Sequence, residues 1–215
     1  IDHRLVVNWH KLLADTFSDR IQSAARTASE DNTFHKCSLN SGIIHRMDWK
    51  YCPYCSSKLT ENDAHSLKCT GCGKLHYFNP KSTVGIIFFN EKGQVVLSVR
   101  GREPAKGKLD IIGGFVDLGE SIEEALYREV EEEAGLSPDA FTTPQYLGSL
   151  YADYDFMGYN VPHTVSVYMS ELKQEPVAGD DVEGFVVGFL EDIDTSELIL
   201  PEFETFIKQA LQLRS

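Results

Sequence analysis

The sequence predicts an α+β protein, and three kinds of segment support that prediction. Segments rich in β-branched and aromatic residues, bounded by turn residues, indicate strands. Segments whose apolar residues recur every three or four positions indicate amphipathic helices. Two Cys-x-x-Cys pairs indicate a small metal-binding module. The 215-residue chain is long enough for one full domain and one or two small ones.

Residues 1–48 are predicted to be a helical segment. Apolar residues recur at helical spacing over residues 5–29, and this stripe packs either within its own chain or against a second subunit. His35, Cys37 and His45 follow, and we interpret them as residues that bind no metal.

Residues 49–80 are predicted to be a zinc ribbon. Two Cys-x-x-Cys knuckles bring four thiolates to one tetrahedral ion, which leaves no open position and indicates a structural zinc. The four predicted ligands are Cys52, Cys55, Cys69 and Cys72. Disulfides are less favoured because Cys37 would be left over. His65 and His76 are alternative ligands to which we give little weight.

The rest of the chain, residues 81–215, has the pattern of one domain. Strands are expected at residues 82–89, 94–99, 145–156 and 164–170, with a last strand ending at residue 189. The turn at 90–93 makes the first two a hairpin. A loop through Met157, Gly158 and Pro162 joins the next two. A closing helix over residues 201–213 should cover the sheet with its apolar face.

The clearest helix begins after Ser121. Ser121 and Glu124 have the spacing of a capping box, and Gly135 supplies the stop. Glu129, Glu132 and Glu133 fall beside or within the apolar arc of this helix, so we expect them to point inward or into a cleft. A solvated acidic face is the alternative interpretation.

Inward-facing glutamates at this spacing repel one another by roughly 0.2–0.5 kcal/mol per pair, and by more when partly buried. A hard divalent cation reverses that cost, because Mg²⁺ and Mn²⁺ prefer carboxylate oxygens. Arg128 lies within helical reach of Glu124 and Glu132 and is expected to orient a carboxylate.

The whole pattern is more specific than its parts. Gly114 is followed after five residues by Glu120 and, after seven more, by Arg128-Glu-Val-Glu-Glu-Glu-Ala-Gly-Leu136. This resembles the signature of the Nudix hydrolases at every fixed position. The resemblance implies an α/β/α sandwich around a mixed sheet. It also implies cleavage of the diphosphate linkage in a nucleoside diphosphate joined to another group.

The resemblance further implies that Glu129, Glu132 and Glu133 hold Mg²⁺ or Mn²⁺, and that one of the last two is the base that deprotonates water. Physical chemistry agrees, since phosphoryl transfer needs charge neutralisation and an activated water. Glutamates in a later loop of some Nudix enzymes share these tasks, which makes Glu183 a secondary candidate.

The same resemblance implies supporting roles around the helix. Gly113 would contribute a backbone carbonyl near the metal, and Gly114 would allow the tight loop. Glu120 and Arg128 would support the helix geometry.

Substrate recognition is less sharply predicted. Arg100 and Arg102 belong to the main basic loop, residues 100–108, and are expected to meet substrate phosphate, with a solvated loop as the alternative. Of the aromatic residues between 146 and 159, one or two are expected to stack on a nucleobase and most to pack on strands.

A zinc ribbon joined to a Nudix domain resembles the NADH pyrophosphatase branch, although that branch's proline- and tryptophan-rich array is not found after residue 136. An ADP-ribose-like or NAD(H)-like dinucleotide is the first expectation, ahead of nucleotide sugars and nucleoside triphosphates. The alternative is a sensor that binds nucleotide without cutting it, which the intact glutamates disfavour. The family resemblance favours a homodimer.

The formal net charge of −13 disfavours non-specific binding to nucleic acid or to anionic membranes. It also disfavours a third interpretation, an RNA-binding module built on the ribbon. No apolar run approaches the roughly 20 residues that span a membrane, and no signal-peptide pattern opens the chain, so we expect a cytoplasmic protein. Because the first residue is Ile1, a missing leading segment is left open.

Overall fold

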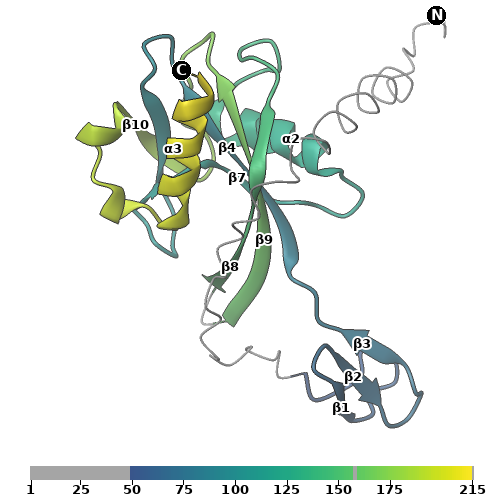
Figure 1. Cartoon of the computed structure of the whole chain (residues 1–215). Coiled ribbons are helices and arrows are strands. Elements are labelled where there is room, and N and C mark those ends of the chain that lie inside the picture. Colours follow the sequence, from purple (N-terminus) through teal and green to yellow (C-terminus); the bar gives the residue numbers. More distant parts are fainter. Residues whose placement is uncertain (1–48, 157–158, 215) are drawn as a thin grey trace, which may run out of the picture. The chain divides into compact units, whose positions relative to one another are not determined.

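The computed structural model describes residues 49–156 and 159–214. The helix predicted over residues 5–29, and the three residues interpreted as binding no metal, lie outside this part of the chain. The described residues form a three-stranded sheet, a seven-stranded sheet and two α-helices (Figure 1).

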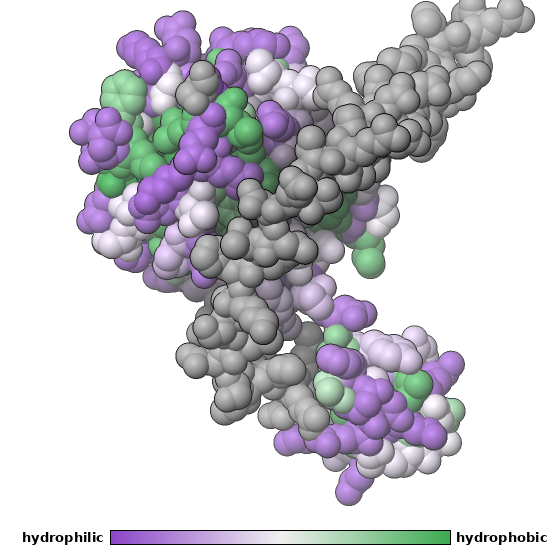
Figure 2. Space-filling model, in the orientation of Figure 1, coloured by the Kyte–Doolittle hydropathy of each residue, from purple (hydrophilic) through white to green (hydrophobic). Residues whose placement is uncertain are grey.

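The three-stranded sheet is the ribbon. Its antiparallel strands, in the order β1-β2-β3, are β1 (Leu59–Asp63), β2 (Ser66–Cys69) and β3 (Leu75–Tyr77). Each Cys-x-x-Cys knuckle is closed by a backbone hydrogen bond, from the N–H of Ser56 to the oxygen of Cys52 and from Gly73 to Cys69. The ribbon surface in view is mostly hydrophilic (Figure 2). The buried hydrophobic residues of the described ribbon are Cys52, Leu67 and Cys69, so this small unit has little apolar core with which to stabilise itself.

The seven-stranded sheet has a central path in the order β10-β5-β4-β9-β8. On this path lie β4 (Lys81–Phe89), β5 (Val95–Arg100), β8 (Gln145–Phe156), β9 (Tyr159–Glu171) and β10 (Val182–Gly188). The short strands β6 (Leu109–Asp110) and β7 (Ile112–Phe115) pair with β5 and β4. β4 and β9 are parallel, whereas β4 is antiparallel to β5 and β7. The sheet is therefore mixed, as expected.

Alternate residues of β4 serve the two faces of this sheet. Val84, Ile86 and Phe88 share a core cluster with the buried residues of α2 (Ile122–Ala134). Ile87 and Phe89 share the other cluster with the buried residues of α3 (Glu202–Arg214). One helix thus covers each face (Figure 1), and the predicted α/β/α sandwich is confirmed.

The predicted strands at 82–89, 94–99 and 145–156 and the closing helix are confirmed within two residues. The loop through Pro162 is wrong, because β9 begins at Tyr159 and Pro162 pairs with Asp153 of β8. β4 starts opposite His163, so Pro162 lies beyond the end of β4. A proline fits there because it lacks an N–H to donate to a neighbouring strand.

Two three-residue 3₁₀ turns, Leu190–Asp192 and Thr195–Glu197, connect β10 to α3. This segment brings Leu198 beside Leu109 of β6 through an isolated parallel bridge. It therefore places the start of α3 near the strands that lead to Gly113.

Candidate active site

Helix α2 has the predicted caps. The Ser121 hydroxyl accepts a hydrogen bond from the Glu124 N–H at 3.1 Å, and the Glu124 carboxylate accepts one from the Ser121 N–H at 2.7 Å. Gly135 ends the helix with a left-handed backbone, φ 61°. The capping box and the glycine stop are confirmed, and they fix where the glutamates of the helix lie.

The three glutamates that were expected to face inward, Glu129, Glu132 and Glu133, lie in two different environments. Glu129 and Glu133 are partly buried and line a cleft, whereas the Glu132 side chain is 52% exposed. The expected inward orientation is wrong for Glu132. Its position is about 200° around the helix from buried Val130, so Glu132 faces away from the core.

Arg128 holds the carboxylates of this region together. Its Nε lies 2.7 Å from Glu120, and its Nη1 lies 2.7 Å from Glu129 and 3.1 Å from Glu132. Its Nη2 donates to the Phe115 carbonyl at 3.0 Å. Arg128 thus orients carboxylates, as expected. Of the two glutamates within its helical reach it contacts Glu132, while Glu124 is engaged in the capping box. The hydrogen bonds from Arg128 lower the pKa of Glu120 to about 2.

Glu133 faces the glycine loop. Its carboxylate accepts a hydrogen bond from the Gly113 N–H at 3.0 Å. Burial raises the pKa of Glu133 to about 8, with further contributions from the nearby carboxylates of Glu129, Asp110 and Asp181. A carboxylate that resists ionisation beside other carboxylates is a place where a cation would be stabilising.

The two glycines of the loop meet different neighbours. A Cβ on Gly113, whose φ is 152°, would lie 2.0 Å from the Val84 backbone oxygen. A Cβ on Gly114 would lie 2.4 Å from a carboxylate oxygen of Glu129. The first glycine therefore permits the close pairing of β7 with β4, and the second leaves room for the Glu129 side chain.

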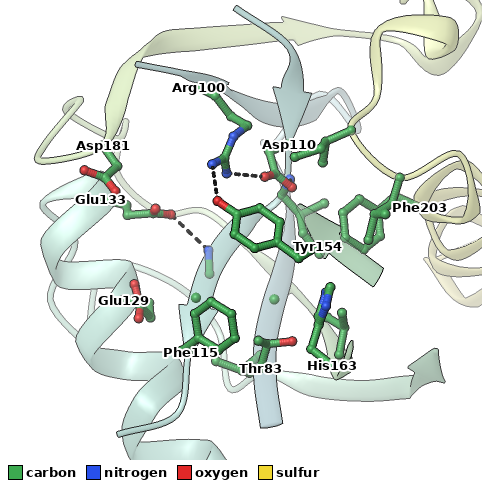
Figure 3. Close-up of a pocket in the computed structure, with 18 of the residues that line it drawn as sticks. Thr83, Arg100, Asp110, Phe115, Glu129, Glu133, Tyr154, His163, Asp181 and Phe203 are labelled. Atoms are coloured by element: carbon green, nitrogen blue, oxygen red, sulfur yellow. Dashed lines mark hydrogen bonds and ion pairs between the residues drawn. The ribbon is translucent and has the colours of Figure 1, made fainter. Parts of the chain in front are cut away.

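A cleft of about 470 Å³ joins these groups to an aromatic wall (Figure 3). Arg100 lies on its upper side with an ion pair to Asp110 at 2.9 Å. Phe115, Tyr154 and His163 form the wall, and each pair of their ring centroids is 6.2 Å apart. The cleft thus offers carboxylates, the guanidinium groups of Arg100 and Arg128, and several aromatic rings to a ligand.

Other predicted residues lie outside the cleft. Arg102 is exposed and forms ion pairs with Asp180 and Asp181 at 2.7 and 2.6 Å, and it does not line the cleft. Glu183 is exposed on β10 and does not line the cleft either. Sequence reasoning missed Asp110, which does line it. Asp110 lies three residues before Gly113, but its contact with Arg100, ten positions earlier, depends on the pairing of β6 with β5.

Asp181 also lines the cleft and was not predicted. It belongs to the same acidic run, residues 180–183, as the predicted residue Glu183. Among the aromatic residues, Tyr154 lines the cleft, whereas Tyr146 and Tyr151 are exposed and do not line it. The side chains of Phe156 and Tyr159 lie outside the described residues.

The ribbon holds a second candidate site. Within residues 49–156 and 159–214, its four cysteines are the only group of three or more potential ligands whose atoms all lie within 4.8 Å. The Sγ atoms of Cys52 and Cys72 are 3.8 Å apart, and those of Cys55 and Cys69 are 3.4 Å apart. Zinc–sulfur bonds of about 2.3 Å in a tetrahedron require sulfurs about 3.8 Å apart, so the cluster is compatible with zinc.

Backbone groups around Cys69 favour its thiolate form and lower its pKa. The backbone N–H groups of Gly71 and Cys72 donate to the Cys69 sulfur at 3.3 Å. The His76 Nε2 lies 3.4 Å from the Cys52 sulfur. His76 is therefore placed to hydrogen bond to a ligand and to orient it, while His65 is exposed on the turn before β2.

The model of the NUDIX domain matches residues 79–203, more than half of the chain. The chain belongs to the NUDIX family. It is 30% identical over 118 residues to the NAD-capped RNA hydrolase NudC of Chromobacterium violaceum, a match covering 54% of this chain and 39% of that protein. It is 33% identical over 140 residues to the protein of the same name from Haemophilus influenzae strain PittGG, covering 58% and 52%. The chain thus spans about half or less of the length of these relatives.

Solved structures agree on the fold. A NUDIX hydrolase from Nitrosomonas europaea superposes with a TM-score of 0.58 at 22% identity, covering 77% of this chain and 92% of that one. The NUDIX domain of Shewanella oneidensis NrtR, solved in complex with ADP ribose, gives a TM-score of 0.53 at 18% identity, covering 65% and 91%. At these identities the likeness shows the NUDIX fold.

None of the helices in the described residues is both long enough and apolar enough to cross a membrane.

Proposed function

We propose that this chain is a metal-dependent NUDIX pyrophosphohydrolase that cleaves the diphosphate linkage of an NAD(H)-like or ADP-ribose-like dinucleotide. One observation carries the proposal: Glu129 and Glu133 line the same cleft as Arg100 and three aromatic rings. Hydrolysis of a diphosphate needs carboxylates that can hold metal ions, and recognition of a dinucleotide needs rings on which a base can stack.

The chemistry follows from the oxygen donors of α2. Glu129, Glu132 and Glu133 would hold Mg²⁺ or Mn²⁺, ions that prefer oxygen ligands. When bound, such ions neutralise charge on the diphosphate and lower the pKa of water. Arg128 orients Glu129 and Glu132 through its two Nη1 contacts. Glu132 or Glu133 would accept the proton from the attacking water.

The substrate half of the proposal rests on the other wall of the cleft. The Arg100 guanidinium provides a fixed positive charge for a phosphate in a strongly acidic protein. Phe115, Tyr154 and His163 present aromatic faces and edges on which a base can stack. The relatives named as NAD-capped RNA hydrolases support an NAD(H)-like group. The expectation that this acidic chain avoids nucleic acid remains a prediction.

We further propose the division into a helical segment at 1–48, a zinc ribbon at 49–80 and a NUDIX domain at 81–215, with Zn²⁺ as the ion of the ribbon. The family match starting at residue 79 supports the last boundary. The homodimer and the cytoplasmic location stay predictions.

A hydrolysis screen tests the function. Protein is incubated with Mg²⁺ or Mn²⁺ and NADH, NAD, ADP-ribose, nucleotide sugars or nucleoside triphosphates, and the products are separated by chromatography. We expect one preferred dinucleotide to give two monophosphates, with no turnover when a chelator is present. Folded protein that binds nucleotide but cuts none of these compounds would indicate the sensor instead.

A further inference from the structure

We infer that Asp110 is a positioning residue that holds Arg100 against Tyr154, and that this chain of three side chains selects ligands carrying a flat ring joined through ribose to phosphate. The inference rests on the proposed function and identifies the groups that select its substrate. Figure 3 shows Arg100 joined by dashed lines to Asp110 and to the Tyr154 hydroxyl.

Asp110 is fixed on both of its oxygens. Oδ1 accepts a hydrogen bond from the Ile111 N–H at 2.8 Å, and Oδ2 accepts one from the Arg100 Nη1 at 2.9 Å. Only 16% of the Asp110 side chain and 22% of the Arg100 side chain is exposed. A carboxylate held in this way restricts the guanidinium to one orientation.

The Arg100 guanidinium, held in this orientation, donates to two further groups. Its Nε donates to the Pro104 carbonyl and its Nη2 to the Tyr154 hydroxyl, both at 3.2 Å. Three of the five N–H donors of a guanidinium are then engaged, which leaves two that can reach a phosphate oxygen. Arg100 can therefore hold Tyr154 and contact substrate at the same time.

The strands themselves do not fix this contact. Arg100 ends β5 and Tyr154 belongs to β8, and β4 and β9 lie between these strands in the sheet. No backbone ladder joins β5 to β8 in the described sheet. The Arg100–Tyr154 hydrogen bond is therefore a side-chain link between strands that are not neighbours in the sheet.

Tyr154 is also part of the aromatic wall. Its ring meets Phe115 at 68° and His163 at 85°, with the centroids of each pair 6.2 Å apart. Moving the Tyr154 ring would open this wall. Loss of the Asp110 charge and loss of the Tyr154 hydroxyl should consequently have the same effect, because both weaken the contact between Arg100 and the ring.

The test compares the binding of three monophosphates by calorimetry: adenosine monophosphate, nicotinamide mononucleotide and ribose 5-phosphate. All contain ribose and phosphate, and only the first two carry a flat ring. We expect the native protein to bind at least one ring-bearing compound about tenfold more tightly than ribose 5-phosphate. Asp110→Asn and Tyr154→Phe should each reduce that ratio about fivefold.

The double variant distinguishes an effect of Asp110 that acts through Arg100 on Tyr154 from two independent effects. If Asp110 acts through Arg100 on Tyr154, the double variant should also lose about fivefold, whereas independent effects would multiply to about 25-fold. Tyr146→Phe, an exposed tyrosine on the same strand, is the matched control and should leave the ratio unchanged. If Asp110→Asn does not fold, Tyr154→Phe alone decides.

An unchanged ratio in Tyr154→Phe, multiplying losses in the double variant, or a native protein without ring preference would each overturn the inference. These ligands contain no diphosphate linkage, so the test can be read whether or not the chain hydrolyses dinucleotides. A negative result here would likewise leave the hydrolysis screen unaffected.

Discussion

The four cysteines of the ribbon and the three candidate ligands of α2, Glu129, Glu132 and Glu133, are two candidate metal sites in different states of assembly. The cysteine sulfurs already lie within 4.8 Å of one another. The glutamates do not form such a group in the described residues, because Arg128 binds Glu129 and Glu132 while Glu133 accepts from Gly113.

This difference matches two different tasks. A closed thiolate site gives its binding energy to folding and leaves no position for a substrate. Carboxylates held by an arginine and a backbone N–H keep their positions without converging, so an ion and an anionic substrate can complete the site together.

Removal of the ion from the ribbon should have the largest effect. Zinc binding supplies about 10–16 kcal/mol to small zinc modules, and the ribbon has little core to replace it. We expect about one zinc per chain by elemental analysis. Cys52→Ser should lose zinc and make the ribbon sensitive to protease, and added Mg²⁺ should not restore it.

Cys37→Ser is the matched control, because Cys37 is predicted to bind no metal, and it should keep zinc. Absence of zinc from protein prepared without chelator would contradict the prediction of a structural zinc site in the ribbon.

Glu132→Gln should affect turnover and not folding. The side chain is half exposed, so its loss costs little packing, but the site would lose a charged ligand or the base. We expect turnover to fall about 100-fold or more, with an unchanged melting temperature. Glu131→Gln, an exposed neighbour on the same helix, should retain activity. Near-native turnover in Glu132→Gln would contradict the carboxylate site.

Substitutions of the neighbouring residues Gly113 and Gly114 should separate an effect on stability from an effect on turnover. Gly113→Ala places a Cβ against the Val84 backbone oxygen and at a φ that alanine avoids, and should destabilise the protein by about 3 kcal/mol or more. Gly114→Ala meets only the movable end of Glu129. It should melt near the native temperature and lose turnover. Equal melting temperatures for the two variants would show that the loop yields at both positions.

The sequence predicted helix α2, its capping box and the cysteine cluster because each depends on short-range spacing. Ser121 with Glu124 and Cys52 with Cys55 are separated by three residues, and their geometry is local. The strands at 82–99 were equally accessible, since their β-branched and aromatic runs are bounded by clear turns.

The parts that sequence reasoning missed depend on partners distant in the chain. Asp110 acquires a role only because β6 pairs with β5 and brings it to Arg100. Pro162 fits in β9 because β4 starts only opposite the next residue, His163. Glu183 was chosen over Asp181 from the same acidic run, and nothing in the local pattern shows that the cleft receives Asp181.

The smallest effect concerns the contact that holds the glutamates in place. The pKa of Glu120 is lowered from 4.5 to about 2 by Arg128, so its contribution to stability is fully present above pH 4.5 and is lost as the pH falls towards 2. Glu120→Gln should therefore lower the melting temperature by about 2–4 °C at pH 7 and by progressively less below pH 4.5. Glu131→Gln should show no such convergence. A gap between native and Glu120→Gln protein that stayed constant from pH 7 to pH 3 would mean that Arg128 stabilises α2 through its other partners. Arg128 would then be positioned by Glu129 and Glu132 without a contribution from Glu120.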